Sequence, residues 1–99
     1  MYARITTVHA PPDRMDEGIR IFESEVLPPT REQPGFRGAY LLVDRATGKA
    51  ISITLWETEA DLERSDAVAH LTRVTSTLAI GASAAPLGEH YELAIEVHV

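Results

Sequence analysis

Hydrophobic and polar positions alternate along several stretches of this chain. Over residues 50–56, Ile51, Ile53 and Leu55 fall on one face, and Trp56 falls on the other with small and polar residues. A period of two is typical of a β-strand. The same pattern predicts further strands over residues 2–9, 36–43 and 91–99.

Two other stretches repeat their apolar residues at helical spacing. The first begins after Pro11 and has a single apolar stripe, formed by Met15, Ile19, Phe22 and Val26. Pro12 suits the first turn of this helix, where a missing N–H is harmless. Pro28-Pro29 is predicted to end it, because the residue before a proline avoids helical geometry.

The second helix is predicted to start directly after Trp56. Thr58 is the expected N-cap, with Asp61 three residues later as in a capping box. Leu62 begins its buried side, and the helical pattern continues to about Ile80. Ser65-Asp66 is a candidate point of interruption, because both residues favour caps over helix interiors.

The predicted order is βαββαβ in one domain over residues 1–99. This order indicates an α+β fold of the ferredoxin-like type: a four-stranded antiparallel sheet with two helices on one face. Pro34-Gly35 and Gly48 supply the expected turns. Apolar residues remain on the other face of the sheet, so we expect a homodimer that joins two sheet faces.

Composition excludes several classes of protein. The chain has no cysteine, so disulfides and thiolate metal sites are excluded. Its formal net charge is -6 with scattered basic residues, which argues against a nucleic-acid partner. No apolar run approaches the length of a membrane span, and no signal peptide is evident. We therefore expect a cytoplasmic protein without a membrane partner.

Two side chains are the main candidates for chemistry. Trp56, the single tryptophan, is either a platform for a flat ligand or a core residue at the joint between strand and helix. His70 is either a general base that faces inward or a structural histidine. No two histidines have i, i+4 spacing, so no metal site is expected.

Short motifs carry a family resemblance. The segments P-G-F-R-G at 34–38, I-S-I-T-L at 51–55 and W-E-T-E-A-D-L at 56–62 are similar to the antibiotic biosynthesis monooxygenase domain of the dimeric α/β-barrel superfamily. The resemblance implies a homodimer with a ligand cavity between sheet and helices in each subunit. It also implies oxidation of quinol-like or polyketide-like aromatic molecules by O2 with no metal or flavin cofactor.

The resemblance also implies roles for individual residues. Trp56 matches the tryptophan that borders the substrate. The catalytic asparagine of polyketide-tailoring members is replaced here by Ser52, and their tyrosine by Leu62. The expected catalytic residues are His70 and Ser52. The expected substrate contacts are Trp56, Tyr40, Leu62 and Phe22.

Three functions follow from these residues. The first is a cofactor-independent monooxygenase that acts on an aromatic quinol. The second is a non-catalytic dimer that binds a small ligand, because Ser52 and Leu62 replace polar groups of the family. The third is an isomerase-type proton transfer in the same cavity. Haem degradation is disfavoured, because residues 2–9 contain no asparagine and the chain has no second tryptophan.

Overall fold

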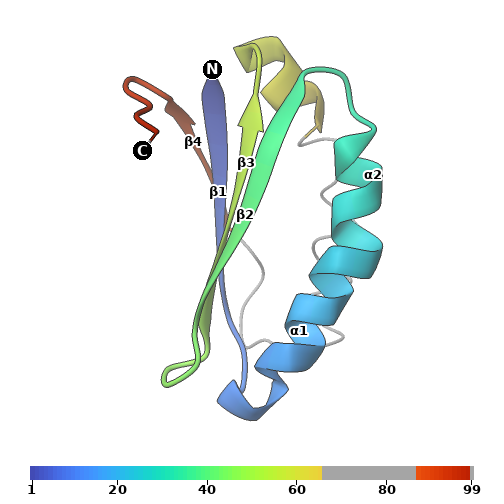
Figure 1. The fold of residues 1–99 in the computed structure, drawn as a ribbon, viewed down its shortest axis with the longest axis vertical. Helices are drawn as coiled ribbons and strands as arrows, with labels where there is room; N and C mark the ends of the chain where they lie inside the picture. Colours follow the sequence, from blue (N-terminus) through green and yellow to red (C-terminus); the bar gives the residue numbers. More distant parts are fainter. Residues whose placement is uncertain (66–86, 99) are drawn as a thin grey trace.

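The computed structural model of the protein describes residues 1–65 and 87–98. Its centre is one antiparallel sheet of four strands in the order β2-β3-β1-β4 (Figure 1). The strands are β1 (Tyr2–His9), β2 (Phe36–Asp44), β3 (Lys49–Trp56) and β4 (Leu87–Glu92). β1 and β3 are the two inner strands, as the ferredoxin-like fold requires.

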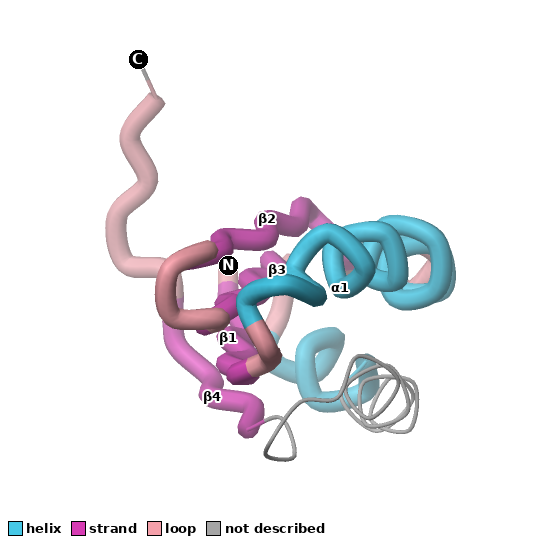
Figure 2. The backbone as a smooth tube through the Cα atoms, turned by 90° about the horizontal axis from the view of Figure 1, so that it is seen from below, coloured by secondary structure: helices cyan, strands magenta, loops and turns pink. Residues whose placement is uncertain are grey.

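A long helical run covers one face of this sheet. It begins with a 3₁₀ turn at Pro12–Arg14 and continues through α1 (Met15–Ile21), a π-helical turn at Phe22–Val26 and α2 (Leu27–Arg31). Residues 59–65 are also helical and lie on the same side of the sheet (Figure 2). The predicted layering, with the helices on one face, is confirmed.

The prediction that Pro28-Pro29 ends the first helix is wrong. The helical run continues to Arg31, because the helix widens by one residue before the prolines. The N–H of Leu27 reaches back five residues to the carbonyl of Phe22. Pro28 and Pro29 then lie in the first turn of α2, where proline is best tolerated in a helix.

The pairing of β1 with β3 fixes which side chains face the helices. Tyr2 lies opposite Trp56, and each second pair along the two strands lies on the same face. Ser52, Thr54 and Trp56 therefore face the helices, whereas Ile51, Ile53 and Leu55 face away. The predicted division of residues 50–56 between two faces is confirmed.

Two glycines make the turns that hold β2 in place. Gly35 and Gly48 both have φ of +82°, which other residues rarely adopt. A Cβ at Gly35 would lie 2.2 Å from Asp61 Oδ2, and one at Gly48 would lie 1.9 Å from the carbonyl oxygen of Ala10. Both predicted turns are confirmed, and each also brings its turn close to another segment.

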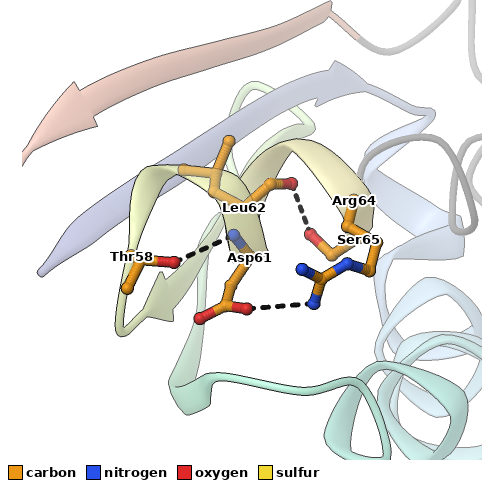
Figure 3. A network of polar contacts seen from close by, with 5 residues as sticks. All are labelled: Thr58, Asp61, Leu62, Arg64 and Ser65. Carbon is orange, nitrogen blue, oxygen red and sulfur yellow. Dashed lines mark hydrogen bonds and ion pairs between the residues drawn. The ribbon is translucent and has the colours of Figure 1, made fainter.

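The helical residues 59–65 start as the sequence predicts. The backbone N–H of Asp61 donates to Thr58 Oγ1 at 3.1 Å, so Thr58 is the N-cap (Figure 3). The carboxylate of Asp61 accepts a hydrogen bond of 3.0 Å from Arg64 Nη1. Ser65 is helical, and Asp66, the second residue of the predicted interruption, lies outside the described residues.

The fourth strand lies earlier in the chain than predicted. β4 spans Leu87–Glu92, whereas the alternating pattern indicated residues 91–99. The reason is the register with β1: Tyr2 pairs with Glu92, and the N–H of Leu93 makes a last bond of 2.8 Å to the carbonyl of Met1. Beyond Leu93 the described tail leaves the sheet, with Ile95 80% and Val97 82% exposed.

Candidate functional site

Trp56 is fixed at the joint between β3 and the helical residues 59–65. Its side chain is 0% exposed. The indole Nε1 donates to Thr54 Oγ1 at 3.0 Å, and the Phe36 ring meets the indole edge to face at 5.6 Å between centroids. The guanidinium carbon of Arg4 lies 5.6 Å from the centre of the same ring, in the range of a cation–π contact.

Arg4 links this joint to the helical layer. It projects from β1, is almost fully buried, and donates from Nη1 to Ser65 Oγ at 2.8 Å. Ser65 Oγ in turn donates to the carbonyl of Leu62 at 2.7 Å (Figure 3). A buried guanidinium is stable only with good hydrogen-bond partners, and Ser65 is one of them.

A cavity lies beside this network, between the sheet and the first helical run. The volume of this cavity that is open to a water-sized molecule is about 20 Å³. That space is enough for about one water molecule. Its walls are formed by side chains of β1, β3 and the helical run, namely Arg4, Thr6, Phe22, Val26, Leu27, Thr30, Ser52 and Thr54.

The two walls of the cavity differ in chemistry. The sheet wall carries hydroxyl groups and a guanidinium, from Arg4, Thr6, Ser52 and Thr54. The helix wall is mostly apolar and includes the π-helical turn, whose Phe22 and Val26 face the cavity. The hydroxyl of Thr30 is engaged in its own helix, where it donates to the carbonyl of Val26 at 2.7 Å. Such a site can hold an oxygen atom against the sheet and an apolar group against the helix.

The structure brings two of the predicted site residues to this cavity, Ser52 and Phe22. Trp56 and Leu62 are buried beside it in the same layer but are not among the described residues that line it. Tyr40 lies on the opposite face of the sheet and is exposed there, because it pairs with Ile53. His70 lies outside the described residues.

The cavity is also lined by Arg4, Thr6 and Thr54, which the sequence pattern did not indicate as site residues. All three lie on the face of their strands that packs against the helices, where an apolar side chain is the usual expectation. The signal that could have found them is this mismatch: Arg4 and Thr6 are polar at alternate positions of β1, on the face that Trp56 shares across the sheet.

The described residues contain no metal-binding cluster and no membrane span. Within residues 1–65 and 87–98, no three His, Asp or Glu side chains converge on a point that could hold a metal ion. In the same ranges, no helix combines the length and the hydrophobicity that crossing a bilayer requires.

The fold and the cavity define a ferredoxin-like α+β protein with a small internal site between sheet and helices. The chain belongs to the antibiotic biosynthesis monooxygenase family, whose model matches residues 1–74. The resemblance noted in the sequence is therefore confirmed.

The chain is also similar to a curated relative over most of its length. The uncharacterized protein Rv2557 of Mycobacterium tuberculosis is 37% identical over 73 residues, which are 74% of this chain and 33% of that protein. The chain thus spans about a third of the length of that curated relative.

Two solved structures show the same fold. The ActVA-Orf6 monooxygenase of Streptomyces coelicolor, in complex with nanaomycin D, superposes with a TM-score of 0.81 at 16% identity, over 99% of this chain and 91% of that one. The heme-degrader MhuD of Mycobacterium tuberculosis, with two hemes bound, gives 0.69 at 17% identity, over 99% and 100% of the two chains. At these identities the similarity concerns the fold.

Proposed function

We propose that this chain is a cofactor-independent monooxygenase that oxidises an electron-rich aromatic molecule of the quinol or anthrone type with O2. The observation that carries the proposal is the cavity of a family member with a polar sheet wall and an apolar helix wall. An aromatic substrate with ring oxygens has the same two-sided character.

The proposed reaction needs little from the protein. A base removes a proton from the substrate, and the resulting anion itself reduces O2. For a CH2 group of an anthrone, one oxygen atom becomes the carbonyl oxygen. The other leaves as water with the two hydrogens. The site has to position the ring, accept a proton and stabilise the developing oxyanion.

Named residues take these roles in the proposal. His70 accepts the proton, Ser52 holds a ring oxygen, and Phe22 contacts the apolar part of the ring. Trp56 and Leu62 support the ring from the buried layer behind the cavity. Because the cavity admits about one water molecule, the helix wall has to shift outward before a polycyclic ring can enter.

We also propose that two copies of this chain form a homodimer through the open faces of their sheets. That face carries Tyr40, Leu42 and Tyr91 as exposed side chains, with half-buried Ile51 and Ile53 between them. Monomeric proteins rarely expose large contiguous apolar patches. A second copy of the same face is the simplest cover for it.

The test is O2 consumption by the purified protein with a panel of anthrones and hydroquinones, in the presence of a chelator. We expect turnover by the wild type and a loss of roughly 100-fold or more in kcat for His70→Ala, the usual contribution of a general base. Ser24→Ala, on the exposed surface of the helical run, is the matched control. No O2 consumption with any substrate, or equal rates for His70→Ala and wild type, would refute the proposal.

A second candidate is a dimer that binds a small ligand without turnover. It is favoured by the burial of Leu62, an apolar residue at the position where the resemblance implies a tyrosine in polyketide-tailoring members. A ligand that raises the Tm without any O2 consumption would support this candidate over the enzyme.

A further inference from the structure

Two hydroxyl groups face each other on the sheet wall of the cavity. Thr6 of β1 lies directly opposite Ser52 of β3 in the antiparallel register. Both residues line the cavity. Opposite residues of neighbouring strands have their Cβ atoms about 5 Å apart, so one oxygen atom placed between these two side chains can contact both hydroxyls.

Neither hydroxyl is used by the part of the protein that the structure describes. Thr6 is only 5% exposed and Ser52 is half-buried, and within residues 1–65 and 87–98 no residue makes a hydrogen bond with either side chain. Buried polar groups in proteins nearly always have a partner, because an unpaired one loses its hydration without compensation. The hydroxyls of Thr6 and Ser52 are therefore available to make hydrogen bonds with a molecule that enters the cavity.

The neighbouring hydroxyl strengthens this picture. Thr54 Oγ1 accepts the indole N–H of Trp56 at 3.0 Å, which engages one of its two lone pairs and leaves its own proton to be donated. Thr30, on the helix wall, already donates to the carbonyl of Val26. The capacity to bind an oxygen atom is thus concentrated on the sheet side, at Thr6 and Ser52 with Thr54 next to them.

We propose that Thr6 and Ser52 form a two-hydroxyl subsite that binds one oxygen of the ligand, as a hydroxyl group or as its deprotonated oxyanion, while Phe22 and Val26 contact the apolar ring that carries it. The identity of this ligand as an aromatic hydroxyl compound rests on the proposed function. Hydroxyl groups can accept from a phenol and can donate to a phenolate, so the subsite holds the oxygen in both protonation states.

The subsite determines specificity. A ligand of the same shape without the oxygen leaves both hydroxyls unpaired inside the protein, and a site built to bind a hydroxyl discriminates strongly against such an analogue. Displacing a water from the subsite with an apolar group has the same penalty. The preference of the protein for the ligand that carries the oxygen should therefore disappear when the hydroxyls of Thr6 and Ser52 are removed.

Isothermal titration calorimetry with 1-naphthol and 1-methylnaphthalene tests this directly, since the two probes differ in one hydroxyl. We expect wild type to bind 1-naphthol about tenfold or more tightly than 1-methylnaphthalene, the effect of one or two buried hydrogen bonds. Thr6→Val and Ser52→Ala should each reduce that preference, and the double variant should abolish it. Thr6→Ser, which keeps the hydroxyl, should retain it.

Thr7→Val is the matched control, because Thr7 is the next residue of β1 and faces away from the helices, opposite Ile51. It should bind both probes as wild type does. Equal affinity of wild type for the two probes, no binding of either probe, or an undiminished preference in the double variant would overturn the proposal. A preference that depends on Thr6 and Ser52 in a protein that consumes no O2 would instead refute the monooxygenase and leave the subsite in place.

Discussion

Arg4 Nη1 donates a hydrogen bond of 2.8 Å to Ser65 Oγ, although 61 residues separate the two in the sequence. This bond joins the central strand β1 to the helical residues 59–65 across the interior. The same guanidinium lies over the ring of Trp56. A single side chain, which itself lines the cavity, thus connects β1 to the indole of Trp56 and to the helical residues 59–65.

Removing the hydroxyl of Ser65 should show how much its hydrogen bond with Arg4 contributes to stability. Ser65→Ala leaves a buried guanidinium N–H without its acceptor, which costs about 1–3 kcal/mol of unfolding free energy. Urea unfolding followed by circular dichroism measures the change. Ser24→Ala is the control, because the hydroxyl of Ser24 is exposed and bonds only within its own helix; it should change stability by less than about 0.5 kcal/mol. Equal effects of the two substitutions would contradict the role given to Ser65.

The burial of Trp56 gives an optical prediction. Since it is the only tryptophan, all indole fluorescence comes from this joint. We expect weak quenching of the native protein by iodide and strong quenching after unfolding in urea. Phe36→Leu removes the ring that meets the indole edge, and should make the native emission easier to quench. Strong quenching of the native wild type would show that the indole is accessible to water.

The turn at Gly35 lies close to Asp61 of the second helix, and a substitution at Gly35 tests how tightly the two segments pack. Gly35→Ala forces a positive φ on a residue with a Cβ, at a cost of about 1–2 kcal/mol, and places that Cβ against the carboxylate of Asp61. Gly38→Ala is the control: its nearest contact would be 3.7 Å from Leu55 Cδ1, an ordinary packing distance. Thermal unfolding should show a larger decrease in Tm for Gly35→Ala.

The proposed homodimer predicts a change in mass on mutation of the open sheet face. Leu42 lies on that face and is 52% exposed in the single chain. Leu42→Asp places a charge in the proposed interface and should shift the protein from dimer to monomer in sedimentation velocity. Ser24→Asp introduces the same charge on the exposed side of the helical run and should leave the dimer intact. A wild type that sediments as a monomer at high concentration would refute the dimer.

Tyr91 and Glu89 form a titratable pair on the same open face. The Tyr91 hydroxyl donates to Glu89 Oε2 at 2.7 Å, and this hydrogen bond, together with the nearby negative charge, raises the pKa of Tyr91 above 10.0. A raised folded pKa means that the stabilising contribution is present below pH 10 and is lost as the pH rises through the folded value. Ultraviolet titration of tyrosinate should therefore show that Tyr91 ionises at a lower pH in Glu89→Gln than in wild type.

Much of the fold could be predicted because local and global patterns agree in the middle of the chain. Ile51, Ile53 and Leu55 alternate with Ser52 and Thr54, and Thr58 is a suitable N-cap, so strand, joint and helix start follow from neighbouring residues. The position of β4 could not be predicted in this way. Its alternating pattern continues past Glu92, and only the register with β1 determines where pairing stops.

The site was harder to predict than the fold. A polar residue such as Thr6 looks the same in a sequence whether it faces solvent or an internal cavity, and only the helices that cover it decide between the two. The helix end predicted from Pro28-Pro29 was wrong for a related reason. The local rule for proline assumes a regular helix, whereas the chain widens to a π turn just before it.

That wide turn has a consequence for the helix wall. It accommodates one residue more than a regular turn would, so the extra residue is absorbed within Phe22–Val26. Deleting a single residue there should return the helix to a regular turn and leave Thr30 in the interior. Deleting one residue from the regular segment α1 would instead rotate Leu27–Arg31 by about 100° around the axis, because each residue of a regular helix advances the chain by that angle. The wide turn is thus the place in this helix where a one-codon deletion would leave the cavity wall in position.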